Sequence, residues 1–429
     1  MEQVAPSQPG RPGDPRRAAI GRIAAPAAAV PVALTAAAIG TFSSPPLANV
    51  AVGLALLLAL ASHAMRARLV FVAGQPLGRA ALVLFAVMTL AMAWAPVPWP
   101  ERFAAWWNWR TLLLIVVAAA AFGDSRWKER FCLSLIVVVA LGAVASFAMW
   151  AAGVTADPPF AGTLMRNHVT QSMALAVGVL LAGMLAAQSE RSARSRGLLA
   201  VGALVSLANL VLVTAGRSGQ VALAVAALVG ALLIFTGPRR WQAVLAMLAL
   251  AAGLVAVSPK LQQRFALIAQ EAPSMDCTSS QENSSGLRLL LWRTTAGLIR
   301  ERPWFGYGVG GFTPAYAAAL PRQVDGRPLT GWCAHPVHDP HNQFLRVTVE
   351  AGLLGLIAFA GLIVGAARQR APQPYRACGL ALLAAWCTTS LFNSHFQTFN
   401  EGHLIALLLG ALLAPEYEPP TIAVNSTGR

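Results

Sequence analysis

Charged side chains are scarce in this sequence: 11% of its 429 residues are charged and 56% are hydrophobic. Soluble globular proteins carry roughly 25% charged residues, so the scarcity argues against a soluble enzyme and predicts an integral membrane protein. Acidic residues are the scarcest, with 17 against 32 Lys and Arg, which gives a net charge of +15. A nucleic-acid binder gathers basic residues on one solvated face. Here the arginines lie between apolar segments, which indicates a role in membrane topology.

Cysteine is also rare, and the five cysteines follow no metal-ligand spacing. Cys132, Cys378 and Cys387 fall in apolar segments and are expected to be small buried hydrophobic residues. Cys277 and Cys333 lie in the one long polar stretch. If that stretch faces an oxidising compartment, the two can form a disulfide, and two free thiols are the alternative.

Long apolar runs dominate the remainder of the sequence. A bilayer core about 30 Å thick needs about 20 apolar residues per helical span. Twelve runs of about this length occur, nine within residues 18–257 and three within 343–415. The sequence therefore predicts an all-α polytopic membrane protein of about 12 transmembrane helices, with a large loop over residues 258–342 between spans 9 and 10.

The orientation of these spans follows from Lys and Arg in the short loops, which favour the cytoplasmic side. The asymmetry fits two cytoplasmic termini, with residues 1–17 as a disordered tail and 416–429 as a second tail. The loop over 258–342 is then periplasmic, and apolar spacing predicts helices over 259–270 and 287–301 within it. Five tryptophans gather between Trp94 and Trp109, either as an interfacial aromatic belt or as a surface that contacts sugar or lipid.

Three histidines, His335, His338 and His341, fall within seven residues before an apolar run. Zinc is one interpretation of this spacing. Prolines within the cluster prevent a regular helix that would align the rings, and Asp339 is expected to cap a helix that begins at Pro340. A general base is a second interpretation, because the unperturbed pKa of histidine lies near physiological pH. Hydrogen-bonded structural histidines are the third.

Arginines mark the predicted outer face. Arg217 lies between two apolar runs, where an ionisable residue indicates function unless it only reaches toward the interface. Arg288 and Arg302 lie on or just after the second predicted loop helix, and Arg166 precedes a span in a second outer loop. Because guanidinium binds phosphate oxygens in pairs and stays charged, these residues indicate a phosphorylated lipid as substrate.

Three motifs then occur in order. They are Thr-Ala-Gly-Arg-Ser-Gly around Arg217, the stretch over 286–312 that contains Gly-Leu-Arg-Leu-Leu-Leu-Trp-Arg and Arg-Pro-Trp-Phe-Gly-Tyr-Gly-Val-Gly-Gly-Phe, and His-Asp-Pro-His-Asn-Gln-Phe-Leu from His338, followed by Glu-Ala-Gly-Leu-Leu-Gly. Together they make the sequence resemble the O-antigen ligase family, whose members share a fold with O-antigen polymerases and bacterial protein O-oligosaccharyltransferases. The resemblance covers about residues 160–360 by motif and the whole chain by span count and loop placement.

This resemblance implies a metal-independent, cofactor-free, inverting glycosyltransferase in the bacterial inner membrane with a periplasmic active site. It would transfer O-antigen polysaccharide from undecaprenyl pyrophosphate to a sugar hydroxyl of lipid A-core. Arg217 and Arg288 match the family's essential arginines and would hold the pyrophosphate, while His338 would accept the hydroxyl proton. Arg302, Arg166, His341 and Asn342 are further predicted substrate contacts.

The spacing of the histidines departs from the family pattern His-x-His-Asn, since here it reads His338-Asp-Pro-His341-Asn342. Either histidine can therefore be the base, and His338 is favoured because His341 is expected inside the start of the helix. Two alternatives in the same fold are an O-antigen polymerase and a protein O-oligosaccharyltransferase. A lipid transporter is a third, but a transporter places its polar residues near the bilayer midplane, whereas here they gather at one face.

Overall fold

The computed structural model describes residues 15–158, 160–188, 190–257, 262, 284–320, 323–324, 327–328, 335 and 337–417. Cys277 and Cys333 lie outside these residues, and so does nearly all of the predicted helix over 259–270. The disulfide and that helix therefore stay predictions.

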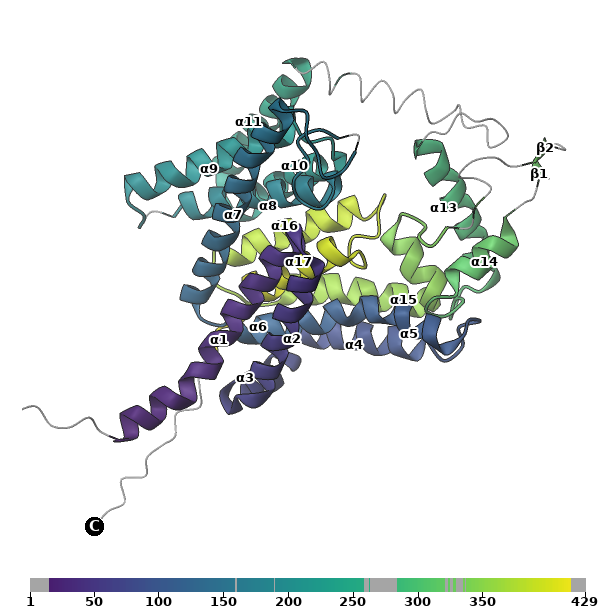
Figure 1. The fold of residues 1–429 in the computed structure, drawn as a ribbon, viewed down its shortest axis with the longest axis horizontal. Coiled ribbons are helices and arrows are strands. Elements are labelled where there is room, and N and C mark those ends of the chain that lie inside the picture. The colour runs from purple at the N-terminus through teal and green to yellow at the C-terminus, as the bar shows by residue number, and fades with distance from the viewer. Residues whose placement is uncertain are drawn as a thin grey trace, which may run out of the picture.

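The described chain is almost entirely helical (Figure 1). Its elements are α1 (Pro15–Ser43), α2 (Pro45–Ala61), α3 (His63–Ala73), α4 (Pro76–Leu90), α5 (Trp99–Trp107), η1 (Asn108–Arg110), α6 (Thr111–Ala121), α7 (Ser125–Ala151), α8 (His168–Ala186), α9 (Ala193–Leu212), α10 (Arg217–Ile234), α11 (Gly237–Val257), α13 (Ser284–Glu301), α14 (Phe312–Ala319), β1 (Gln323–Val324), β2 (Arg327–Pro328), α15 (Gln343–Arg368), α16 (Tyr375–Thr389) and α17 (Phe399–Leu412). The two strands pair antiparallel as a minimal hairpin. The all-α prediction holds for the rest of the described elements.

Six described helices are long and apolar enough to cross a membrane, judged by length and composition: Trp99–Ala121, α7, α8, α9, α10 and α15. The pair α2 and α3 meets at 100° and adds a seventh if it forms one span. Every one of the twelve predicted apolar runs coincides with helix, but several of these helices are short. The structure therefore agrees with a polytopic membrane protein, while the number of twelve crossings stays a prediction.

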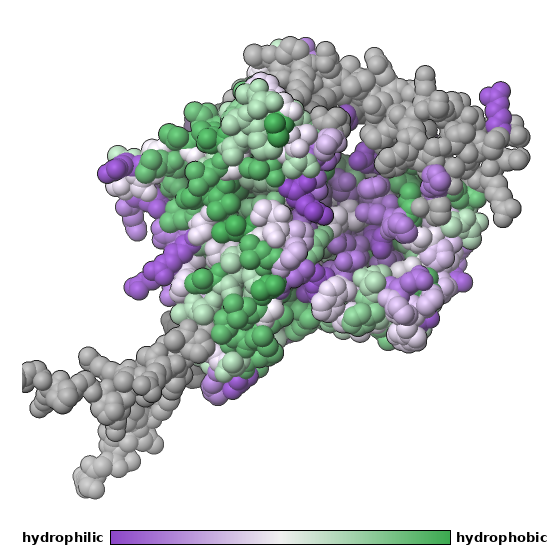
Figure 2. All heavy atoms as spheres, viewed as in Figure 1, coloured by the Kyte–Doolittle hydropathy of each residue, from purple (hydrophilic) through white to green (hydrophobic). Residues whose placement is uncertain are grey.

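Large apolar side chains lie exposed along the outer helices, as a lipid-facing surface requires. Exposed positions recur on α2, α7 and α9 and include Leu57, Leu141 and Leu204. Figure 2 shows this hydrophobic surface over the body of the molecule, and hydrophilic residues gathered in a hollow between that body and α13 and α14. Many of the described polar residues thus gather in this hollow.

Helices α8 and α10 pack closely because two glycines leave room at the start of α10. A Cβ on Gly216 would lie 2.4 Å from the carbonyl oxygen of His168, and one on Gly219 would lie 2.1 Å from that of Ser172. The hydroxyl of Ser172 accepts a hydrogen bond from the Gly219 amide at 3.1 Å. The small residues around Arg217 therefore serve helix packing, and they place Arg217 at the first residue of α10.

Helix α15 is broken at Gly352, where φ is 64° and ψ is −160°. Only glycine adopts this backbone conformation readily, and a Cβ here would lie 2.2 Å from the carbonyl carbon of Trp304. The glycine-rich segment after α13 fills the break. The Tyr307 amide donates to the carbonyl of Val349 at 2.8 Å, and the Gly308 amide donates to that of Glu350 at 2.8 Å.

Candidate active site

The loop before α15 carries His338 to Asn342. The sequence pattern predicts Asp339 as the cap of the helix and His341 inside its first turn, and both predictions are wrong. Asn342 is the N-cap, and its side-chain oxygen accepts from the amides of Phe344 and Leu345. Asp339 instead accepts from the His341 amide at 2.9 Å. His341 lies outside the helix with a φ of 51°, a left-handed conformation that is uncommon outside glycine.

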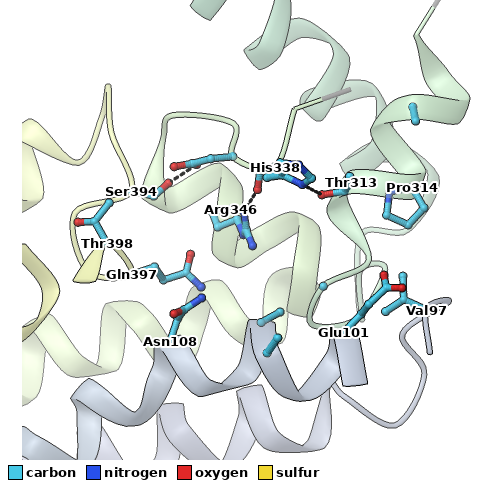
Figure 3. A pocket seen from close by; sticks show the side chains of 15 residues that line it. Val97, Glu101, Asn108, Thr313, Pro314, His338, Arg346, Ser394, Gln397 and Thr398 are labelled. Carbon is cyan, nitrogen blue, oxygen red and sulfur yellow. Dashed lines mark hydrogen bonds between the residues drawn. The ribbon is translucent and has the colours of Figure 1, made fainter. Parts of the chain in front are cut away.

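His338 is exposed, and its ring faces α14. Its Nδ1 lies 3.2 Å from the hydroxyl of Thr313, which leaves Nε2 without a protein partner among the described residues. Its backbone carbonyl accepts a hydrogen bond from the guanidinium of Arg346 (Figure 3). The loop that presents His338 is therefore held both by α14 and by α15.

A buried ion pair within α15 stabilises the position of the loop that carries His338. Arg346 Nη2 lies 2.8 Å from Glu350 Oε1, and the carboxylate of Glu350 is 0% exposed. The same oxygen accepts from the Gly310 amide at 3.3 Å. An unpaired buried charge costs several kcal/mol, so Arg346 and Glu350 stabilise each other while Arg346 holds the carbonyl of His338.

A cavity of about 650 Å³ opens beside His338 (Figure 3). Its walls come from α5 and η1, from α14 with the glycine-rich segment, from the loop before α15, and from the segment between α16 and α17. Three of its polar side chains, Glu101, Asn108 and Gln397, make no hydrogen bond to another described residue. Planar amides and carboxylates of this kind can bind the hydroxyl groups of a sugar in pairs.

The comparisons with known proteins match the part of the chain that contains this loop. The family model described as "O-Antigen ligase" matches residues 202–360. Residues 202–360 are therefore similar to the O-antigen ligase family. A protein of Rickettsia conorii named "Putative polysaccharide ligase" is 31% identical over 102 residues, which is 23% of this chain and 24% of that protein. A protein of the same name from Rickettsia felis is 29% identical over 102 residues, with the same coverage. The chain thus spans about a quarter of the length of these relatives.

Within residues 202–360, the charge of Arg288 acts on the pKa of His341. Arg288 is half-buried on α13. Burial lowers the pKa of His341 below its ordinary value, and although Asp339 raises it, the positive charge of Arg288 lowers it further. Burial and the charge of Arg288 therefore both favour the neutral form of His341.

Neither Arg288 nor the other predicted arginines line the described cavity. Arg217 is exposed at the start of α10. Arg302 is exposed, and its guanidinium lies 4.6 Å from the ring centre of Tyr307, so it packs within its own segment. Arg166, which precedes the matched residues 202–360, is exposed with a φ of 47°. Their roles as substrate contacts stay predictions.

Several residues around the site were missed by the sequence analysis. The sequence does mark Arg346 and Glu350 as a candidate ion pair. They lie four residues apart near the start of an apolar run, where ionisable residues are costly unless paired. Glu101, Asn108 and Gln397 gave no such signal, because they reach the cavity from segments far away in the sequence. Among the described residues, no group of three or more His, Cys, Asp or Glu side chains could hold a metal ion.

We expect the buried side chain of His395 to make the stability of the fold depend on pH. It is 1% exposed, and neither ring nitrogen has a hydrogen-bond partner among the described residues. Burial lowers its pKa, although Glu401 and Asp339 raise it, and His341 lowers it further. The unfolded chain, with a histidine pKa of about 6.5, then binds more protons than the folded one at acidic pH. The stability contribution of neutral His395 is complete above about pH 6.5 and is lost as the pH falls toward the lower folded pKa.

His395→Phe keeps a ring in this position and removes the titration. We expect the decrease in Tm between about pH 7.5 and about pH 5.5 to be smaller in the variant than in the wild type, measured in detergent. The exposed His63→Phe is the matched control and should leave the decrease unchanged. An equal decrease in the wild type and His395→Phe would contradict the assignment.

Proposed function

We propose that this chain is a membrane glycosyltransferase that transfers O-antigen polysaccharide from undecaprenyl pyrophosphate to a sugar hydroxyl of lipid A-core. The family match supports the class of reaction. The observation that carries the proposal is the placement of His338, which lines a cavity of about 650 Å³ and is fixed from two sides by Thr313 and Arg346. Such a fixed base beside a cavity with several polar side chains suits the deprotonation of a bound hydroxyl.

His338 is the proposed general base. If its Nδ1 carries the proton and donates to Thr313, then Nε2 presents a lone pair that can accept a proton. The acceptor hydroxyl gives this proton to Nε2 as its oxygen attacks the anomeric carbon of the donor sugar. The bond from that carbon to the pyrophosphate oxygen breaks, and its electrons stay on the pyrophosphate. A single attack of this kind inverts the anomeric configuration.

Arg217 and Arg288 are proposed to hold the pyrophosphate. The leaving group gains negative charge in the transition state, and fixed guanidinium groups in a partly dehydrated site stabilise that charge. Arg288 fits this role because it is half-buried and its charge acts on His341 in the loop of the proposed base. Arg302, Arg166 and Asn342 are proposed to contribute at the rim. No metal ion or organic cofactor takes part in this scheme.

The proposed location is the bacterial inner membrane, with both termini in the cytoplasm and the site open to the periplasm. Six helices suited to crossing a membrane support the embedding. In this orientation α13 and α14 form a periplasmic cap over the bundle, and the cavity lies between that cap and the membrane helices. A donor on a polyprenyl chain and an acceptor on lipid A can both enter such a cavity from the bilayer.

The test is reconstitution of the full chain in liposomes with undecaprenyl-pyrophosphate-linked polysaccharide and a choice of acceptors. Lipid A-core is expected to be extended, with product detected by gel mobility and mass spectrometry. A second copy of the linked polysaccharide and an acceptor protein are the comparison acceptors. Preferential extension of the polysaccharide would identify a polymerase, and modification of the protein would identify a protein O-oligosaccharyltransferase. Activity that EDTA abolishes and zinc restores would contradict the metal-independent mechanism.

A further inference from the structure

The segment from Ser390 to Thr398, between α16 and α17, lies outside residues 202–360, which match the family model, but contacts them on two sides. On one side, the side-chain amide of Asn393 donates to the hydroxyl of Ser218 at 3.2 Å. Ser218 directly follows Arg217 at the start of α10. Asn393 therefore holds the helix end that presents one of the proposed pyrophosphate ligands.

On the other side, the hydroxyl of Ser394 donates to Asp339 Oδ1 at 2.6 Å (Figure 3). Asp339 directly follows His338, and the same oxygen accepts from the amide of His341 at 2.9 Å. One carboxylate oxygen thus receives two hydrogen bonds, one from within its loop and one from the segment. Ser394 is 2% exposed, so water competes little with this contact.

Backbone contacts fix the same segment to the start of α15. The Gln343 amide donates to the carbonyl of Ser390 at 2.8 Å, and the Phe396 amide donates to Gln343 Oε1 at 3.1 Å. Asn342, the N-cap, donates its side-chain amide to the carbonyl of Leu391 at 2.9 Å. The segment is therefore held on α15 before its side chains reach Ser218 and Asp339.

Asn393 and Ser394 are consecutive, so their Cα atoms are about 3.8 Å apart. Through them, the residue after Arg217 and the residue after His338 are tied to neighbouring points of one anchored segment. Rates of group transfer depend on placement, and an error of about 1 Å can cost about 100-fold. We propose that Asn393 and Ser394 are positioning residues that set the separation between the pyrophosphate ligand and the base. This inference rests on the proposed function.

The first experiment compares kinetic constants in the reconstituted assay. Ser394→Ala is expected to lower kcat by about 10-fold, with the KM for the acceptor changed by less than about 2-fold, because the base is displaced while the cavity remains. Asn393→Ala is expected to raise the KM for the donor several-fold. Thr388→Ala is the matched control, since its hydroxyl bonds only within α16, to the carbonyl of Ala384. It should keep wild-type constants.

A second experiment separates positioning from general stability. Asp339→Asn keeps an oxygen that can accept from Ser394 and His341, so it should retain most of the activity that Asp339→Ala loses. The double variant Ser394→Ala with Asp339→Ala should be no slower than Asp339→Ala alone, because both changes remove one contact. Elution and Tm in detergent show whether each variant is folded, and the Asp339 pair tests the inference if Ser394→Ala is not recovered.

Wild-type kinetics in both Ser394→Ala and Asn393→Ala would overturn the inference. An Asp339→Asn variant as slow as Asp339→Ala would also overturn it. The negative charge of Asp339, and not its hydrogen bonds to Ser394 and His341, would then be required. In both outcomes the proposed function stands if His338→Ala is inactive. An active His338→Ala would instead overturn the proposed function itself.

Discussion

His338→Ala is expected to reduce transfer by about 10²-fold to 10⁴-fold, the range that a general base contributes. The variant keeps the backbone carbonyl that Arg346 binds, so the loop should stay in place. Initial rates in liposomes with linked polysaccharide and lipid A-core measure the effect. Since the loss is in proton transfer, it should appear in kcat, with KM for both substrates nearly unchanged.

Two other histidines in the same stretch provide controls. His335 is exposed and contributes no described contact to the cavity, so His335→Ala should keep near wild-type rates. The transfer rate of His341→Ala should lie between those of His338→Ala and His335→Ala. The charge of Arg288 acts on His341, but His341 is not the proposed base. Normal transfer by His338→Ala together with an inactive His341→Ala would assign the base to His341 and contradict the role of His338.

Arg288→Ala is expected to lower kcat by about 10²-fold to 10³-fold, comparable to the loss of a fixed donor to a developing negative charge. Arg288→Lys should recover part of the rate, because lysine keeps the charge but loses the paired donors. Single-turnover rates with saturating linked donor are the measurement, since they report the chemical step without product release.

Arg293 is the matched control for this prediction. It lies on the same helix, α13, and is exposed. Arg293→Ala removes the same charge from the same element and is expected to leave the rate within about 2-fold, as for most exposed charges far from a contact. Equal losses in Arg288→Ala and Arg293→Ala would indicate a general electrostatic effect of the cap and would refute a specific role for Arg288.

The helix α13 shows what local pattern can predict. Apolar spacing predicted a helix over 287–301, and the structure has it at Ser284–Glu301. Leu291 and Leu298 on this helix are 0% and 3% exposed. The glycine-rich segment after it fills the break in α15. This role depends on the partner helix and has no local signature in the sequence.

The cap of α15 shows where a local pattern misleads. Asp-Pro is a common helix start, but the N-cap is Asn342, three residues after Asp339. Asp339 does not cap the helix because Ser394, 55 residues away, and the His341 amide both donate to its carboxylate oxygen. The tryptophan-rich stretch was predicted to be an aromatic belt or a ligand surface. Its helix α5 exposes Trp99 and Trp107 and lines the cavity with other residues, among them Asn108 just beyond its end.

The break at Gly352 joins α15, a candidate membrane helix, to the segment after α13. Beyond the hydrogen bonds to Val349 and Glu350, the Leu353 amide donates outward to the carbonyl of Pro303 at 2.8 Å. The segment after α13 thus takes the place of a missing helical turn, and the two cannot slide independently without leaving backbone groups unpaired. Membrane helices tilt to match bilayer thickness. A tilt of α15 would therefore also displace Gly310, which lines one wall of the cavity.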